Sequence, residues 1–502
     1  MHQAAPVHNP SMLIKVPPRK ATNQKKKNES ILQTTSVISN VSSSASINLP
    51  PQTSYPIVPP QAPPKPPSTA RSVKQKGKSP RSSITKKSTK DPSTISTQKV
   101  NPRVKSNRKR PPPKYNGPID PNYFLANYSD YLTDLEMDEI TNYKEIYYVR
   151  KVPPANKSYN AVLPEHFQFI TNEHINYRYQ MMQVLGKGSF GGVIKCIDHK
   201  NNDKLVAIKL LRDHQKHHEQ IMIEKEFLYE LQNDRGPEVH HVIKIYESFS
   251  FRGFFAIVME LGLIDVYNGL KLQNFLGFSM PTVQIVARQT ADALRFIHGK
   301  GIIHCDFKPE NILFMNQRKT IVKMIDFGCS SNENNLIYTY IQSRFYRAPE
   351  VVFGCNYGPP IDVWGYGCVL CEMITGRPVF EAEDETELMM MYQKMLGPPP
   401  RWMIHEGKRS SLYFEKDGQP ILAPNSDGYI HKPSSSSIQR ETGIQDKLFL
   451  SLIEGCIAWD PNERLKPEQI LRHPWMMHKY NISMNKQSIS AAISVQPETA
   501  RT

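Results

Sequence analysis

The chain has 502 residues, enough for about three domains of ordinary size. Its net charge of +16 is concentrated at one end: residues 1–115 hold 22 of the 63 lysines and arginines, 2 of the 47 acidic residues and 19 of the 41 prolines, so they carry +20 and the remainder −4. No apolar run approaches the ~18 residues of a membrane span, and the sequence does not open on an apolar secretion signal. We therefore expect an intracellular protein, in the cytoplasm, the nucleus or both, without a membrane partner.

Residues 1–115 are predicted to form a disordered leader, because low hydrophobicity, high charge and clusters of Pro and Ser cannot offset the entropy of ordering. The run Arg108-Lys109-Arg110 before three prolines is typical of nuclear import or nucleic-acid binding, although a solvated tail explains it as well. Stacking on single strands is disfavoured, since Tyr55 is the only aromatic residue before Tyr115. The proline clusters also fit a partner that binds polyproline helices.

Residues 116–178 are predicted to form a small accessory segment. Thr133 and Glu136 supply a Thr-x-x-Glu capping box that opens a short helix, and the run from Tyr143 to Tyr148 gives the segment apolar surface to bury. The seven cysteines all follow the leader without metal-ligand spacing, and the Cys368/Cys371 pair stands in an apolar stretch that favours a buried helix face. Unpaired cysteines indicate a reduced compartment.

From Tyr179 the sequence changes from strand patterns to helix patterns. Strand-like runs surround a glycine turn, and mainly helical patterns follow residue 265. We predict an α+β fold in two lobes, β-rich over about 179–262 and helical over about 263–475, followed by a flexible tail at 476–502. This order is that of the eukaryotic protein kinase fold.

A glycine turn and a lysine in the first lobe fit a nucleotide site. Gly186-x-Gly188-x-x-Gly191-x-Val193 stands between two strand patterns, where glycines let backbone amides approach phosphates, although a structural hairpin explains this motif equally well. Eighteen residues after Gly191 an apolar strand leads into Lys209, which fits a lysine that pairs with the α- and β-phosphates. The residues predicted to contact ATP are Leu185, Gly186, Lys187, Gly188, Ser189, Phe190, Gly191, Val193, Ala207, Lys209, Glu224, Met259, Glu260 and Leu261.

Lys209 needs a carboxylate on the following helix to hold it, and Glu219, Glu224 and Glu226 are the candidates. We favour Glu224, because apolar residues flank it on both sides. If the helix has another register, Glu224 is a solvent-exposed charge on its surface.

The second lobe contains the residue types of phosphoryl transfer in the order that a kinase requires. Asp306 is predicted to orient the substrate hydroxyl and accept its proton, and Lys308 to stabilise the transferring phosphoryl. Asn311, five residues after Asp306, and Asp326, in an Asp-Phe-Gly motif, are the predicted Mg²⁺ ligands. Cys305 stands where an arginine is usual.

Three further residues are predicted to anchor the site. Glu350, in an Ala-Pro-Glu motif, requires a buried cation, and Arg464 is our choice for it. Asp362 is predicted to cap the backbone of the catalytic loop. About fifteen fixed positions in one order make a chance match negligible.

The stretch from Ile337 to Glu350, the glycine turn and His304-Cys305-Asp306 closely resemble the DYRK family, the dual-specificity tyrosine-regulated kinases. The resemblance covers about residues 127–477. Within it, 132–148 resembles the DYRK homology box of the class II branch and 380–439 the insert of the CMGC group. The resemblance implies an enzyme that uses ATP and Mg²⁺, phosphorylates protein substrates on Ser or Thr, and phosphorylates itself on Tyr340. We expect a monomer.

The stretch from Ile337 to Glu350 corresponds, by this resemblance, to the activation segment of a kinase. Cys305 offers no charge that could bind a phosphate on this segment. Arg344 and Arg347, four and seven residues after Tyr340, are predicted to clamp a phosphate there. Each charge-assisted bond contributes on the order of 1.5–3 kcal/mol. A packed aromatic residue is the alternative interpretation of Tyr340.

Two residues of the motifs depart from the family pattern: Phe307 replaces Leu, and Gly192 replaces Gln. Neither removes a charged group, so we expect activity to survive. Met259 replaces the usual Phe at the gatekeeper position, so the nucleotide pocket is expected to differ in shape from that of the family. Glu310 is predicted to attract an arginine on the N-terminal side of the substrate. The rival interpretation is a pseudokinase scaffold that recruits partners through its leader, and the intact catalytic residues argue against it.

Overall fold

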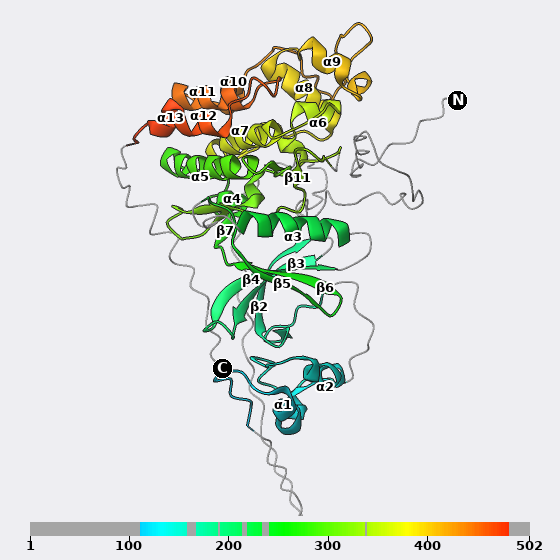
Figure 1. Cartoon of the computed structure of the whole chain (residues 1–502). Helices are drawn as coiled ribbons and strands as arrows, with labels where there is room; N and C mark the ends of the chain where they lie inside the picture. The colour runs from blue at the N-terminus through cyan, green and yellow to red at the C-terminus, as the bar shows by residue number, and fades with distance from the viewer. Residues whose placement is uncertain are drawn as a thin grey trace, which may run out of the picture. The chain divides into compact units, whose positions relative to one another are not determined.

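The computed structural model describes residues 111–157, 167–188, 191–212, 218–232, 240–336 and 339–480 (Figure 1). The predictions made for residues 1–110 of the leader and for the tail from residue 481 onward lie outside the described residues. The remaining residues of both are packed: the Tyr115 hydroxyl donates to the Arg150 carbonyl oxygen (3.2 Å), Met476 is buried, and the Tyr480 hydroxyl donates to Asp446 (2.8 Å). The described part contains an accessory segment, a sheet lobe and a helical lobe in chain order. The predicted two-lobed α+β fold is confirmed.

The sheet lobe is built from a six-stranded antiparallel sheet in the order β1-β2-β3-β4-β6-β5. β4 owes its place in the middle to its sequence, since every side chain from Val206 to Leu211 is buried. Its register aligns Lys209 with Val193 of β3 and Ile257 of β6. One helix, α3 (His218–Gln232), covers a face of this sheet. The strands are β1 (His174–Ile175), β2 (Tyr179–Gly188), β3 (Gly191–Asp198), β4 (Lys204–Arg212), β5 (Ile245–Phe251) and β6 (Phe254–Glu260).

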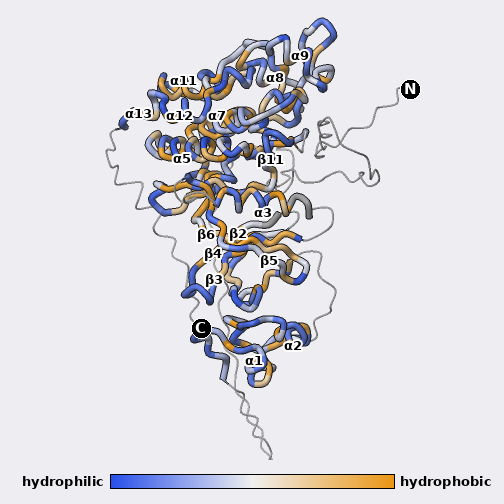
Figure 2. Tube along the Cα trace, in the orientation of Figure 1, coloured by the Kyte–Doolittle hydropathy of each residue, from blue (hydrophilic) through white to orange (hydrophobic). Residues whose placement is uncertain are grey.

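The helical lobe packs around α7 (Pro360–Thr375), which is buried along nearly its whole length, including Cys368 and Cys371. Figure 2 shows the apolar residues that make this helix a core element rather than an amphipathic surface helix. The predicted cysteine placement on a buried helix face is therefore present. The other helices are α4 (Val266–Leu272), α5 (Met280–His298), α6 (Pro349–Phe353), α8 (Glu385–Leu396), α9 (Arg401–Glu406), α10 (Ile438–Thr442), α11 (Lys447–Cys456), α12 (Pro467–Arg472) and α13 (Pro474–Met477).

Short strands of the helical lobe hold the loops that carry the chemistry. The loop between β8 (Ile302–Ile303) and β9 (Ile312–Phe314) contains the predicted catalytic residues, and the loop between β10 (Val322–Met324) and β11 (Ser331–Asn332) contains Asp326. β9 lies between β10 and β7 (Ile264–Asp265), and β8 pairs with β11. Both loops therefore start and end on paired backbone.

The accessory segment packs on the sheet lobe through buried charges. α1 (Pro121–Tyr128) precedes α2 (Asp134–Glu139), which opens with the predicted capping box: the Thr133 backbone N–H donates to Glu136 Oε2 (2.9 Å). The Glu136 carboxylate also accepts two bonds of 2.6 Å from the guanidinium of Arg150. Arg252, from the turn between β5 and β6, donates to Glu139 (3.0 Å). These bonds connect the accessory segment to the sheet lobe.

Candidate active site

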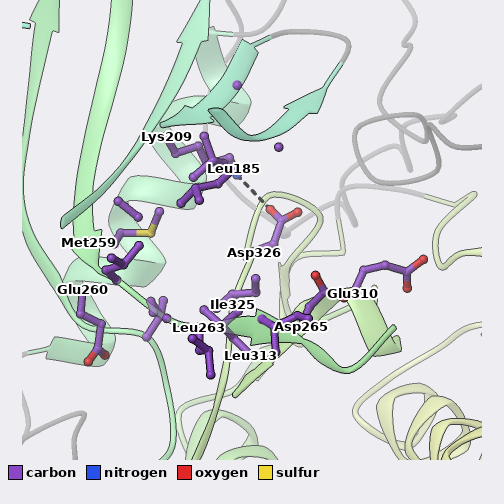
Figure 3. Close-up of a pocket in the computed structure, with 18 of the residues that line it drawn as sticks. Leu185, Lys209, Met259, Glu260, Leu263, Asp265, Glu310, Leu313, Ile325 and Asp326 are labelled. Atoms are coloured by element: carbon purple, nitrogen blue, oxygen red, sulfur yellow. Dashed lines mark hydrogen bonds and ion pairs between the residues drawn. The ribbon is translucent and has the colours of Figure 1, made fainter. Parts of the chain in front are cut away.

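A cavity of about 630 Å³ lies between the two lobes. Figure 3 shows its lining, with Lys209 and Leu185 on the sheet side and Asp326 and Ile325 on the helical side. Lys187 and Gly188 end β2 beside it, whereas Ser189 and Phe190 lie outside the described residues. The predicted nucleotide-contacting residues that line the cavity are Leu185, Gly186, Gly191, Val193, Ala207, Lys209, Glu224, Met259, Glu260 and Leu261.

Gly191 is required by packing as well as by access to phosphates. A Cβ on Gly191 would lie 1.7 Å from the carbonyl oxygen of Leu210 on β4, which no rearrangement of a side chain could relieve. At Gly186, by contrast, an added Cβ would meet nothing within 4 Å. The two glycines therefore act differently: Gly186 leaves space above the cavity, and Gly191 lets β3 approach β4.

The amide of Glu260 is already used by the protein. Its N–H donates to the carbonyl oxygen of Lys244 (3.0 Å), so it is not a donor for a nucleotide base. The Glu260 side chain accepts a bond from the Lys244 N–H (2.7 Å) and pairs with Lys323. Both Glu260 and Leu261, which were predicted to contact the nucleotide, line the cavity, but the Glu260 N–H is used by the segment that leads into β5.

Lys209 joins the two lobes electrostatically. Its Nζ lies 2.6 Å from Oε1 of Glu224 on α3 and 2.9 Å from Oδ1 of Asp326 in the helical lobe. Burial alone would raise the pKa of Asp326, but the charge of Lys209 outweighs it and lowers that pKa to about 2. Glu224 is buried, whereas Glu226 on the same helix is exposed. A charged lysine between two carboxylates is thus held at the back of the cavity.

The catalytic loop is fixed from below by Asp362. The backbone N–H groups of His304 and Cys305 donate to its two carboxylate oxygens at 2.8 and 2.9 Å. Cys305 is fully buried and has a φ of 63°, and Asp326 has a φ of 65°. Such left-handed backbone is costly outside glycine and concentrates at functional sites. The bond from its N–H to Asp362 holds Cys305 in this conformation.

The predicted catalytic side chains of the helical lobe meet at Asp306. Lys308 Nζ lies 2.7 Å from Asp306 Oδ2, and Asn311 Nδ2 donates to the Asp306 carbonyl oxygen (2.9 Å). Ser343, which sequence reasoning did not single out, donates from its hydroxyl to Asp306 Oδ1 (2.9 Å) and accepts from Lys308 (3.0 Å). The activation segment therefore contacts the predicted base directly.

A glutamine also links the activation segment to the catalytic loop. The Gln342 N–H donates to the Cys305 carbonyl oxygen (3.1 Å), while its side chain donates to Ile361 O (3.0 Å) and accepts from the Ala348 N–H (2.8 Å). Its φ of 65° makes this crossing point a further strained position. The only sequence signal for Gln342 was its place inside the family-like segment.

The two predicted clamp arginines lie in different places. The Arg347 guanidinium is centred 4.0 Å from the Tyr340 ring, close to the predicted phosphate site. Arg344 instead donates to the backbone carbonyl oxygens of Ala382 and Glu383. Only Arg347 is therefore in contact with Tyr340.

The buried cation for Glu350 is the predicted one. Arg464 forms two parallel bonds of 2.7 Å with the Glu350 carboxylate, and both side chains are fully buried. Arg464 also donates to the carbonyl oxygens of Ala458 (2.9 Å), Pro360 (3.0 Å) and Trp459 (3.2 Å), which satisfies its remaining donors. The pair fixes the end of the activation segment to the base of the helical lobe.

The protein kinase domain model matches residues 179–476. Over 410 residues the chain is 35% identical to dual specificity tyrosine-phosphorylation-regulated kinase 3 of Rattus norvegicus, an alignment that covers 76% of this chain and 70% of the relative. The chain belongs to the DYRK family of protein kinases.

Other DYRK relatives are matched over a smaller part of their length. Dual specificity tyrosine-phosphorylation-regulated kinase 2 of Drosophila melanogaster is 37% identical over 72% of this chain and 52% of its own length. A DYRK-family kinase of Schizosaccharomyces pombe is 37% identical over 70% of this chain and 33% of its own length. This chain thus spans about half of the first of these relatives and a third of the second. None of the helices in the described ranges is both long and apolar enough to cross a membrane.

Proposed function

We propose that this DYRK-family chain is an active protein kinase that transfers the γ-phosphoryl group of ATP to Ser and Thr hydroxyls of protein substrates and to its own Tyr340. The observation that carries the proposal is the Lys209 pairing: one ammonium lies within 2.6 Å of Glu224 and 2.9 Å of Asp326, so both lobes already present the groups that position a nucleotide. A scaffold without activity would have no need to bury these charges together.

In this proposal Asp306 orients the substrate hydroxyl and accepts its proton as the hydroxyl oxygen bonds to the γ-phosphorus. The bond from that phosphorus to the β-phosphate oxygen breaks, and ADP leaves with the electron pair. Lys308, 2.7 Å from Asp306, stabilises the charge on the moving phosphoryl group. The Ser343 contact holds Asp306 against rotation.

Asp326 and Asn311 are the residues that would hold Mg²⁺. The ion prefers oxygen ligands, and a carboxylate and an amide oxygen suit it. Lys209 keeps Asp326 ionised, and the Nδ2 bond from Asn311 to Asp306 orients the Asn311 amide. When bound, Mg²⁺ would neutralise charge on the phosphates.

The decisive experiment compares Asp306→Asn with wild type in a phosphate-transfer assay on a basic protein substrate. We expect the substitution to lower kcat by about 10²–10⁴-fold. Asp417→Asn, an exposed carboxylate in the helical lobe, is the matched control and should retain wild-type activity. Equal, background-level incorporation by all three proteins would end the enzyme proposal and favour the scaffold.

Self-phosphorylation of Tyr340 needs its own measurement. Mass spectrometry of the recombinant protein should find phosphate on Tyr340 in wild type and none in Lys209→Arg, because the lysine positions the donor. Phosphate in both proteins would mean that another kinase supplies it.

Glu310 supports a preference for basic substrates. Its side chain is largely buried, burial raises its pKa, and Oε2 has no hydrogen-bond partner among the described residues. A substrate guanidinium would supply that partner. We expect Glu310→Gln to raise KM selectively for peptides with an arginine before the phosphorylated residue, with little effect on peptides that lack it.

The leader offers a separate proposal. Its charge of +20 fits nucleic acid or nuclear import, and its prolines fit a polyproline-binding partner. Deletion of residues 1–115 should abolish retention on DNA at low salt if the leader is a nucleic-acid arm. Unchanged retention would remove that interpretation.

A further inference from the structure

Two arginines share one carboxylate beside Tyr340. Arg347 Nη1 lies 2.6 Å from Oε1 of Glu385, the first residue of α8. Arg409, which follows α9, donates to the same oxygen from Nη1 (3.2 Å) and to Oε2 from Nη2. Arg347 is at the same time stacked on the Tyr340 ring. The cluster of Tyr340, Arg347, Glu385 and Arg409 brings together three parts of the helical lobe that are distant in sequence.

This cluster has an excess of positive charge and is partly shielded from water. The side chains of Arg347 and Glu385 are 3% and 12% exposed, and that of Arg409 is 33% exposed. Burial raises the pKa of Glu385, but the bonds and charges of both arginines outweigh it and keep that pKa below its ordinary value, so the carboxylate is ionised. Two guanidiniums therefore face one carboxylate, and the remaining positive charge lies next to the tyrosine.

Arg409 is linked to Tyr340 through shared partners. It binds the same Glu385 carboxylate as Arg347, and Arg347 stacks on the Tyr340 ring. Burial lowers the pKa of Arg409, but its bonds to Glu385 outweigh burial and raise it. Arg344, by contrast, is bound to the carbonyl oxygens of residues 382 and 383.

We propose that Glu385 occupies, in the unmodified protein, the anion site that a phosphate on Tyr340 takes after modification, and that Arg409 joins Arg347 as a ligand of that phosphate. The inference rests on the proposed phosphorylation of Tyr340. A phosphate carries about −1.5 to −2 charges and three acceptor oxygens, so it outcompetes a single carboxylate for the two guanidiniums. Glu385 is a positioning residue: it keeps the buried Arg347 and the partly exposed Arg409 together, and with them the activation segment, before any phosphate is present.

The test measures how much a phosphate on Tyr340 raises Tm. Phosphotyrosine is placed at position 340 of the full chain during translation, and half of each preparation is then treated with a tyrosine phosphatase. The comparison therefore does not depend on self-phosphorylation, which mass spectrometry of the ordinary protein reports separately. The variants are Arg409→Met, Arg409→Lys, Glu385→Gln and, as a matched control, Lys408→Met, which changes an exposed neighbouring cation.

We expect the phosphate to raise the Tm of wild type and of Lys408→Met by at least ~3 °C. Arg409→Met should lose about half of that rise or more, and Arg409→Lys should recover part of it. Glu385→Gln should show a larger rise in Tm than wild type. Without phosphate this variant has no Glu385 carboxylate beside the two arginines, whereas unmodified wild type has one. If Arg409 had only a structural role, its substitution would lower the Tm of the phosphorylated and dephosphorylated forms equally and leave the rise in Tm unchanged.

If phosphate raised the Tm of Arg409→Met as much as that of wild type, the proposal would be overturned, even if Glu385→Gln failed to fold. An unchanged rise in a folded Glu385→Gln would overturn the assignment of Glu385 as the earlier occupant. Absence of phosphate on Tyr340 after incubation of the ordinary enzyme with ATP would contradict self-phosphorylation alone.

Discussion

At the scale of single residues, the site depends on charges that are buried only because each has a partner. Lys209 is almost fully buried, yet its pKa is raised: burial lowers it, but Asp326 and Glu224 outweigh burial. Removing one partner would leave a buried charge uncompensated, which typically costs several kcal/mol. Substitution of Asp326 or Glu224 is therefore expected to have a larger effect than substitution of an exposed carboxylate.

Glu224→Gln should lower kcat/KM for ATP by about 10–100-fold, because the neutral amide no longer holds the lysine near the phosphates. Steady-state kinetics at varied ATP measure the effect. Glu226→Gln changes an exposed carboxylate on the same helix and should stay within twofold of wild type. Equal losses in the two variants would mean that Lys209 is positioned by something other than Glu224.

Glu372, on α7, makes the stability of the folded protein depend on pH. Burial raises its pKa from 4.5 to about 8, although a bond of 2.6 Å from the Tyr346 hydroxyl opposes the shift. Between these two pH values the folded chain keeps a proton that the unfolded chain has released, so stability falls as pH rises.

Glu372→Gln has no such proton and should gain roughly 1–3 kcal/mol relative to wild type between pH 5 and pH 8. Thermal unfolding of both proteins across this range measures the difference. A constant difference in Tm would show that Glu372 is ionised in the folded protein.

At the scale of elements, the activation segment is held near its middle by Gln342 and Ser343 and at its end by Glu350 with Arg464. The last pair is bidentate, and each partner is inaccessible to solvent. It fixes the segment to the helical lobe whether or not Tyr340 carries phosphate.

Arg464→Met should lower the free energy of unfolding by about 3–5 kcal/mol, since it leaves the Glu350 charge buried and alone. Denaturant unfolding reports the loss, and Arg472→Met, an exposed arginine of α12, should change it little. Simultaneous Glu350→Leu and Arg464→Met should restore part of the stability. A single-variant loss no larger than that of the control would show that the pair is not a structural anchor.

Sequence reasoning reached the parts of this site that short motifs encode. Thr133 and Glu136 are three residues apart, so local physics alone places their capping box. The family order led to the Lys209–Glu224 pair. The Glu385–Arg409 pair was not predicted, because its members are 24 residues apart on different elements and belong to no local pattern. Arg344 was assigned to the phosphate by spacing alone, whereas the fold turns its side chain toward the loop before α8.

At the scale of the whole molecule, the accessory segment and the sheet lobe behave as one folded unit. Glu136 contacts Arg150 and His174 (2.8 Å) and also lies within reach of Arg252 from the sheet (3.4 Å). Burial raises its pKa, but His174 and Arg150 outweigh burial and hold the pKa far below its usual value. Glu136 thus contacts three basic side chains at the junction, where Glu173 also pairs with Arg150 and Glu139 with Arg252.

Glu136→Gln should therefore destabilise the segment and the sheet together. We expect a single unfolding transition, lowered by about 3–5 kcal/mol, and a parallel loss of kinase activity on mild heating. Asp138→Asn, an exposed carboxylate on the same short helix, is the control. Two separated transitions in the variant would indicate that the accessory segment folds independently of the kinase lobes.

The full burial of Cys305 has a consequence for any attempt to restore the arginine usual at this position. An arginine there would have to bury its charge, while Arg347 and Arg409 already bind the Glu385 carboxylate beside Tyr340. The single substitution would therefore add a buried cation rather than the phosphate site of other kinases.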